Sequence, residues 1–160
     1  MTAKPFDQVV EEHGAVVLRV CRAILTPVDA DDAWSETFLA AMRAYPDLRA
    51  DSNVRAWLVT IAHRKALDRH RVARRNPAPV DSVPEQPTWL GNPSSPDDEL
   101  WNAVRSLPEK QRGAVAYRYL ADLPYREIGA LLGTSEAAAR RSAADGIASL
   151  RSTYAQETAT

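Results

Sequence analysis

The 160-residue sequence has one cysteine, no long apolar run and almost no net charge. A lone Cys21 excludes a disulfide within the chain. It lies on an apolar helical stripe, so we expect it in the core. No apolar run approaches the roughly 18 residues that a membrane-spanning helix needs. The opening segment MTAKPFDQVVEEHG carries acids where a secretory signal needs its apolar centre. These absences predict a cytoplasmic protein with no membrane insertion.

The net charge of −1 conceals an uneven distribution along the chain. Residues 1–76 hold 12 Lys and Arg against 10 acids, residues 77–100 hold none against 5, and residues 101–160 hold 8 against 6. The acidic excess therefore lies in the middle, and both flanks are mildly basic. Because DNA affinity follows local clusters of cations more than total charge, this balance is compatible with a DNA-binding protein.

Residues 77–96 contain six of the eleven prolines. Proline lacks a backbone donor and disfavours helix in the residue before it, so this segment is predicted to be an acidic, Pro-rich linker. It separates residues 1–76 from residues 97–154. Both flanks show helical periodicity and neither shows a strand pattern. The predicted fold class is all-α, with two small helical modules joined by the linker.

The first module is predicted to contain three helices, at residues 5–25, 29–45 and 54–75, with a polar loop at 46–53. The third helix is apolar early and ends in RKALDRHRVARR, which holds six Lys and Arg against Asp68. This composition favours a helix that follows DNA phosphates, with strongly salt-dependent binding. The alternative is a solvated helix end whose cations suit the helix dipole.

The second module is predicted to begin with a helix near Pro96 that Asp97 or Asp98 caps and Pro108 ends. A further helix is expected over residues 109–121. Its inward-facing side chains are predicted to be Val115, Tyr119 and Leu120.

Residues 125–151, YREIGALLGTSEAAARRSAADGIASLR, have the pattern of a helix-turn-helix. Gly133 suits the tight turn because glycine tolerates positive φ, and Ser135 suits the cap of the next helix. That helix is predicted to place Ala139, Ala143, Ile147 and Leu150 inward, and Ala137, Arg141, Ala144 and Asp145 outward. In a helix-turn-helix the second helix enters the major groove of DNA.

The sequence contains no Gly-rich phosphate loop and no nucleophile–base motif. His63 and His70 are seven residues apart, but no further ligand at the usual spacing completes a metal site. We therefore expect no catalytic residues, no metal, no cofactor and no enzymatic activity.

Three segments together resemble the extracytoplasmic-function (ECF) sigma factors of bacterial RNA polymerase. They are DADDAWSETFLAAMRAY (29–45), LRADSNVRAWLVTIAHRKALDRHRVARR (48–75) and LPEKQRGAVAYRYLADLPYREIGALLGTSEAAARRSAADGIASLR (107–151). Their order, the Pro-rich linker and the chain length make the resemblance specific, and it covers nearly the whole chain. It implies a protein that directs core polymerase to promoters by minus-35 recognition and minus-10 melting.

The resemblance also implies roles for individual residues. Residues 1–76 would be a region 2-like domain and residues 97–154 a region 4-like domain. The polymerase-binding residues would be Asp32, Glu36, Thr37 and Phe38. The minus-10 DNA would be held by Asp51, Ser52, Asn53, Arg64, Lys65, Arg69 and Arg71. The minus-35 DNA would be contacted by Ser135, Glu136, Ala137, Arg140 and Arg141. The implied partners are core RNA polymerase, promoter DNA and, as often in the family, an anti-sigma protein.

The sequence departs from the family pattern in two places. Ser35 stands where a glutamine is usual, and the recognition helix has Ser142, Ala144, Asp145 and Ile147 where further basic residues are usual. This motivates the hypothesis of an unusual promoter or of help from another protein. Two alternatives are a stand-alone helix-turn-helix regulator, which would bind duplex DNA without polymerase, and a sigma-like interaction module with weakened DNA contacts.

Overall fold

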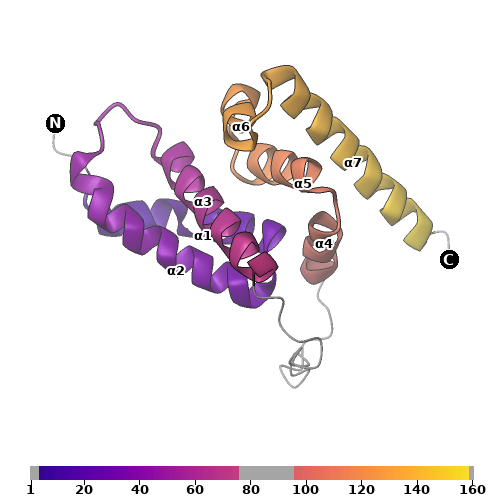
Figure 1. The fold of residues 1–160 in the computed structure, drawn as a ribbon, viewed down its shortest axis with the longest axis horizontal. Helices are drawn as coiled ribbons and strands as arrows, with labels where there is room; N and C mark the ends of the chain where they lie inside the picture. Colours follow the sequence, from indigo (N-terminus) through magenta and orange to yellow (C-terminus); the bar gives the residue numbers. More distant parts are fainter. Residues whose placement is uncertain (1–3, 76–95, 159–160) are drawn as a thin grey trace.

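The computed structural model describes residues 4–75 and 96–158, and these residues form helices and connecting loops without any strand. The predicted linker therefore lies, apart from Pro96, outside the described residues. Two groups of helices lie on either side of this gap in the chain (Figure 1). Among the described residues, no helix is long and apolar enough to cross a membrane.

The first group is a three-helix bundle of α1 (Phe6–Ile24), α2 (Pro27–Ala44) and α3 (Val54–Arg75). The expected helices are confirmed, with a short 3-10 turn at Tyr45–Asp47 inside the expected loop. Cys21 is fully buried, as predicted, and burial raises the pKa of its thiol to about 12. The helices pack through an apolar core because each carries apolar side chains at helical spacing. Its buried members include Val17, Val20, Phe38, Leu58 and Val59.

The second group contains α4 (Pro96–Arg105), α5 (Glu109–Val115), the π-helical segment η4 (Ala116–Leu120), α6 (Tyr125–Leu132) and α7 (Glu136–Thr158). The predicted cap at Asp97 or Asp98 is wrong, because α4 begins at Pro96 and both residues lie in its first turn. Pro108 does separate α4 from α5, as predicted.

The predicted continuous helix over 109–121 is also wrong in its second half. From Ala116 the chain adopts π-helical instead of α-helical geometry. Tyr119 is 58% exposed instead of buried, whereas Tyr117 is 1% exposed. A spacing of four residues from Val115 leads to Tyr119, whereas the buried tyrosine is Tyr117.

The helix-turn-helix prediction is confirmed in its local chemistry. Gly133 ends α6 in the left-handed conformation with φ 69°, and the backbone N–H of Ala138 donates to Ser135 Oγ at 3.1 Å. Gly129 is a second glycine required by the turn, since a Cβ there would lie 2.8 Å from the carbonyl oxygen of Thr134. The inward face of α7 holds the buried Ala139, Ala143 and Leu150.

The two helical groups contact each other. The ends of α1 and α3 lie beside η4, α4 and α6, while α7 lies on the outer side of the second group (Figure 1). A hydrogen bond of 2.5 Å joins His63 Nδ1 on α3 to the Tyr117 hydroxyl on η4. The first group therefore presents α2 to solvent, and the second presents α7.

Candidate nucleic-acid interface

The outer surface of α2 carries two of the four side chains expected to bind polymerase. Asp32 and Glu36 are exposed. Thr37 and Phe38 are 0% and 6% exposed, and Thr37 Oγ1 donates to the carbonyl oxygen of Ala33 at 2.6 Å. Thr37 and Phe38 are therefore part of the core in this structure, and their expected polymerase-binding role stays a prediction.

An exposed apolar stripe on α2 was missed by the sequence reasoning. Val28, Leu39 and Met42 are 61%, 52% and 51% exposed. Their positions continue through the exposed Asp32 and Ser35 at alternating spacings of four and three, so all five share one helical side. The spacing of these residues can be read from the sequence, but only the apolar residues on the core-facing side of the same helix were considered.

Arg69 on α3 is held by three carboxylates of α2. Its guanidinium lies 2.8 Å from Glu36, 3.3 Å from Asp32 and 3.4 Å from Asp29. Partial burial by itself would lower the pKa of Arg69, but the hydrogen bond to Glu36 and the nearby carboxylate charges raise it. The side chain therefore stays charged and joins the expected polymerase-binding surface to the expected DNA-binding helix.

The loop before α3 brings Asp51, Ser52 and Asn53 together at the start of the helix. Asp51 lies 3.5 Å from the guanidinium of Arg49, and the Ser52 N–H donates to the Arg49 carbonyl oxygen. Asn53 Oδ1 accepts from the backbone N–H of Ala56 at 3.1 Å, which is an N-cap contact. Asn53 is exposed while it makes this contact. The side-chain amide of Asn53 also carries two N–H donors, which suit hydrogen bonding to a base edge.

The remaining expected phosphate ligands are spread around α3. Arg64 is exposed and Lys65 is partly buried. Arg71 has a 64% exposed side chain and lies 4.0 Å from Asp68. Arg64 lines a groove between α3 and α6, opposite Glu127 and Leu131. Within the described part of the chain, no group of three or more His, Cys, Asp or Glu is arranged to hold a metal ion.

The start of α7 exposes all five residues expected at the minus-35 element: Ser135, Glu136, Ala137, Arg140 and Arg141. The guanidinium of Arg140 lies 3.5 Å from Glu136 and 5.1 Å from the centre of the Tyr125 ring. Arg118 lies 4.6 Å from the centre of the same ring. Because cations are attracted to an aromatic face, Tyr125 helps to hold Arg140 at the exposed start of α7.

This geometry defines a two-module helical protein with a helix-turn-helix in one module and a basic helix in the other. Residues 9–76 match sigma-70 region 2, and residues 97–150 match sigma-70 region 4. The chain is 32% identical over 146 residues to the ECF RNA polymerase sigma factor SigD of Mycobacterium tuberculosis, covering 83% of this chain and 69% of that protein. It is 28% identical to the ECF RNA polymerase sigma-E factor of Salmonella typhimurium, covering 81% of this chain and 75% of that protein.

Solved structures agree with these relatives. The structure of CnrH in complex with the cytosolic domain of CnrY matches with a TM-score of 0.66 and 25% identity, over 94% of this chain and 88% of that chain. The sigma factor RpoE in complex with the anti-sigma factor NepR from Bartonella quintana has a TM-score of 0.73, over 92% of this chain and 94% of that chain. At 19% identity, the second match shows the fold alone.

The chain belongs to the ECF sigma factors of RNA polymerase. It is a transcription-initiation protein of the sigma-70 type.

Proposed function

We propose that the chain works in the cytoplasm as the promoter-specificity subunit of core RNA polymerase and catalyses no reaction of its own. Residues 1–76 would bind polymerase and the minus-10 element, residues 97–154 would read the minus-35 element, and residues 77–96 would join them. The observation that carries this proposal is the separation of three surfaces on one chain. They are the apolar stripe of α2, the loop and cations of α3, and the exposed start of α7.

The α2 stripe is the proposed polymerase contact. Exposed apolar side chains at helical spacing suit docking onto another helix, and Asp32 and Glu36 add charge beside Leu39 and Met42. Ser35 lies in the middle of this stripe. A short side chain there permits close approach of a partner helix, which offsets the loss of the longer polar group usual in the family.

The start of α3 is the proposed minus-10 contact. A base that leaves the duplex needs polar groups to replace its hydrogen bonds, and Asp51, Ser52 and Asn53 supply them at one exposed loop. Arg64, Lys65 and Arg71 would neutralise adjacent phosphates. Arg69 would act indirectly, since its guanidinium is engaged by Asp29, Asp32 and Glu36.

The start of α7 is the proposed minus-35 contact. Arg140 and Arg141 are exposed and suited to a guanine edge or a phosphate, while Ala137 permits close approach to the groove. The exposed Asp145 opposes phosphate binding further along the same helix. We therefore propose weak minus-35 binding that depends on the rest of the polymerase complex.

An anti-sigma protein is a proposed regulatory partner. Two similar solved structures are complexes: CnrH is bound to the cytosolic domain of CnrY, and RpoE is bound to the anti-sigma factor NepR. In this chain the exposed α2 stripe offers apolar surface to such a partner.

The proposal is tested by binding of the purified full chain to bacterial core polymerase. Leu39→Asp should weaken binding at least about tenfold, because it puts a desolvated charge into an apolar contact. Tyr119→Asp is the matched control: it changes a similarly exposed apolar side chain on the second module and should bind core normally. Equal affinity of both variants and the unchanged chain would contradict polymerase docking on α2.

A further inference from the structure

One aromatic ring of the second module lies beside two arginines that come from different elements. The ring belongs to Tyr125, the first residue of α6, and its side chain is partly buried. The guanidinium of Arg118 on η4 lies 4.6 Å from the ring centre, and that of Arg140 on α7 lies 5.1 Å from it. Because an aromatic face attracts cations, a single side chain of α6 gathers two positive charges.

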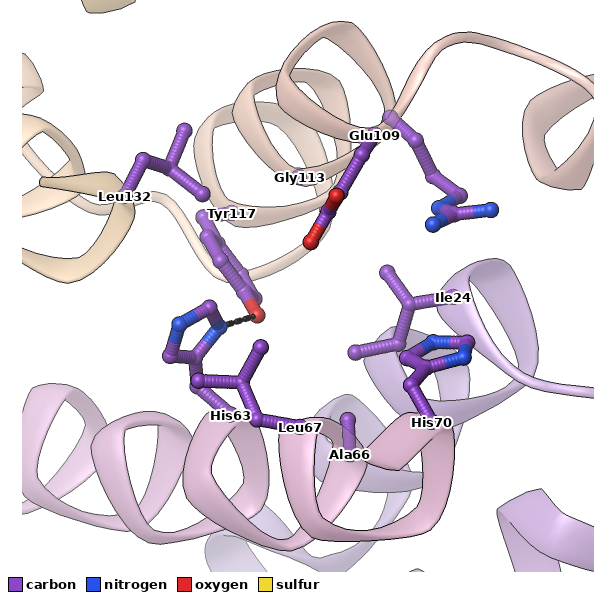
Figure 2. Close-up of a pocket in the computed structure, with 10 residues that line it drawn as sticks. Ile24, His63, Ala66, Leu67, His70, Glu109, Gly113, Tyr117 and Leu132 are labelled. Carbon is purple, nitrogen blue, oxygen red and sulfur yellow. Dashed lines mark hydrogen bonds between the residues drawn. The ribbon is translucent and has the colours of Figure 1, made fainter. Parts of the chain in front are cut away.

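Arg118 is the more firmly held of the two arginines. It is partly buried, and its Nη1 donates to the Leu123 carbonyl oxygen at 3.2 Å. The preceding residue, Tyr117, is buried and points toward α3, where its hydroxyl is hydrogen-bonded to His63 Nδ1 (Figure 2). The Leu123 N–H also donates to the Tyr117 carbonyl oxygen at 3.0 Å. Arg118 therefore meets the Tyr125 ring from a segment whose own position is fixed.

Arg140 has fewer other contacts and depends more on the ring. Its side chain is 61% exposed, and its guanidinium otherwise contacts Glu136 at 3.5 Å, one helical turn earlier. Exposed ion pairs at this spacing contribute little, because water and salt screen them. An unrestrained arginine samples many rotamers, and fixing one of them on binding costs free energy. Contact with the Tyr125 ring restricts these rotamers before DNA is bound.

The ring leaves the hydrogen-bond donors of Arg140 available. A guanidinium stacks on an aromatic ring through its flat face, whereas its five N–H donors point outward in its own plane. A carboxylate such as Glu136 occupies some of these donors, but a ring occupies none. Tyr125 can therefore hold Arg140 while the same guanidinium donates to a phosphate or to a guanine edge.

We propose that Tyr125 and Arg118 are positioning residues for minus-35 recognition: Arg118 holds the ring, and the ring holds Arg140 in one orientation at the exposed start of α7. The inference rests on the proposed minus-35 role of Arg140 and adds two residues that need no contact with a base. It also explains how a recognition helix with few cations discriminates promoters, since a preorganised arginine loses less entropy on binding than a mobile one.

The test compares two duplex DNA fragments that bind the full chain together with core polymerase. One fragment carries a promoter at which the unchanged chain initiates, and the other has its minus-35 element scrambled. The ratio of the two affinities measures minus-35 recognition. Tyr125→Leu should lower this ratio about two- to fivefold, as expected for the loss of an exposed cation–ring contact. Tyr125→Phe keeps the ring and should retain the ratio of the unchanged chain.

Matched controls account for the loss of a ring and for the loss of a charge. Tyr119→Leu removes an exposed ring that takes part in neither cation contact, and it should leave the ratio unchanged. Arg118→Gln should lower the ratio, whereas Arg151→Gln, at an exposed position further along α7, should not. A loss from Arg118→Gln that persists in full after Tyr125→Leu would overturn the role of Arg118 in holding the ring.

The Arg140→Gln background separates positioning from a merely structural role. In that background Tyr125→Leu should cause no further loss of the ratio, because the arginine that the ring positions is gone. An equal loss from Tyr125→Leu with and without Arg140 would overturn the proposal, and so would a full loss in Tyr125→Phe. A ratio that Arg140→Gln alone leaves unchanged would overturn the minus-35 role of Arg140 itself, whatever the Tyr125 variants do.

Discussion

Arg69 Nη2 lies 2.8 Å from Glu36 Oε1, which ties the basic helix of the first module to the helix proposed to bind polymerase. Asp32 and Asp29 complete the cluster at 3.3 and 3.4 Å. The cation that sequence reasoning assigned to DNA is therefore shared among carboxylates of α2. The cluster holds these carboxylates of α2 beside α3, so the helix proposed to bind polymerase and the helix proposed to bind DNA share one side chain.

Arg69→Gln is expected to weaken binding to core polymerase more than it weakens binding to DNA. Without the guanidinium, three neighbouring carboxylates repel one another and lose their fixed orientation. The matched control is Arg71→Gln on the same helix, which carries a 64% exposed side chain and should affect DNA binding alone. Core affinity and DNA affinity measured for both variants check this. A larger loss of DNA binding in Arg69→Gln than in Arg71→Gln would restore Arg69 as a phosphate ligand.

Asn53 is expected to have two separable roles. Asn53→Ala removes the N-cap of α3 and should lower the free energy of unfolding by about 1 kcal/mol. Asn53→Ser retains a capping oxygen and should leave stability nearly unchanged. Both variants should impair open-complex formation more than initial promoter binding, because both lose the amide proposed to contact a flipped base.

Permanganate footprinting of melted promoter DNA, compared with thermal unfolding, separates these roles. If Asn53→Ser melts the promoter as well as the unchanged chain does, Asn53 acts through helix capping alone.

Gly129→Ala should destabilise the second module by about 1–3 kcal/mol, because the added methyl would meet backbone atoms that have little room to move. A Cβ at this position lies 2.8 Å from the Thr134 carbonyl oxygen. Gly14→Ala is the control: its Cβ would lie 3.5 Å from Trp34, an ordinary contact, and alanine favours helix by up to about 1 kcal/mol. Chemical unfolding of both variants measures the difference. Equal stability of the two would show that the turn relaxes around the methyl.

The contact between His63 of α3 and Tyr117 of η4 should weaken as the pH falls. Burial lowers the pKa of His63 below 6.5, although the Leu131 backbone and the charge of Glu109 oppose the shift and Arg64 adds to it. A lowered pKa means that this contact contributes its full stability above about pH 6.5 and loses it as the pH falls through the lowered pKa of His63. Around His63 the other titratable or charged side chains are Tyr117, His70, Arg112 and Glu127.

Thermal unfolding of the unchanged chain, measured from about pH 8 to about pH 5.5, checks this pH dependence. His63→Gln cannot be protonated and should show a flatter profile than the unchanged chain. Identical profiles would assign the effect to other groups, such as His13, whose pKa is also lowered by burial.

Local chemistry made much of the fold predictable. Gly133, Ser135 and the apolar spacing of α7 each depend on neighbours within a few residues, so their roles could be inferred from sequence. The π-helical segment at Ala116–Leu120 could not be inferred, because an apolar pattern that indicates a helix does not distinguish π-helical from α-helical geometry. The spacing from Val115 indicated Tyr119, but the buried tyrosine is Tyr117, two positions earlier and four residues after the buried Gly113.

The candidate site was predictable in residue type but less so in contacts. Resemblance to the family located the α2 and α3 segments, yet it did not distinguish exposed Asp32 and Glu36 from buried Thr37 and Phe38. That distinction requires the angular position of each residue around α2. The ion-pairing role of Arg69 could not be inferred without knowing that Glu36, 33 positions earlier in the chain, lies beside it on the neighbouring helix α2.

Promoter-dependent initiation by core polymerase tests the central claim most directly. Purified chain and bacterial core polymerase are combined with a fragmented genomic library, and transcript starts are mapped. The account predicts initiation at a limited set of sites that share a minus-10 sequence and that disappear when the chain is omitted or replaced by Leu39→Asp. Transcription that is unaffected by adding the chain, despite a folded protein, would contradict the account.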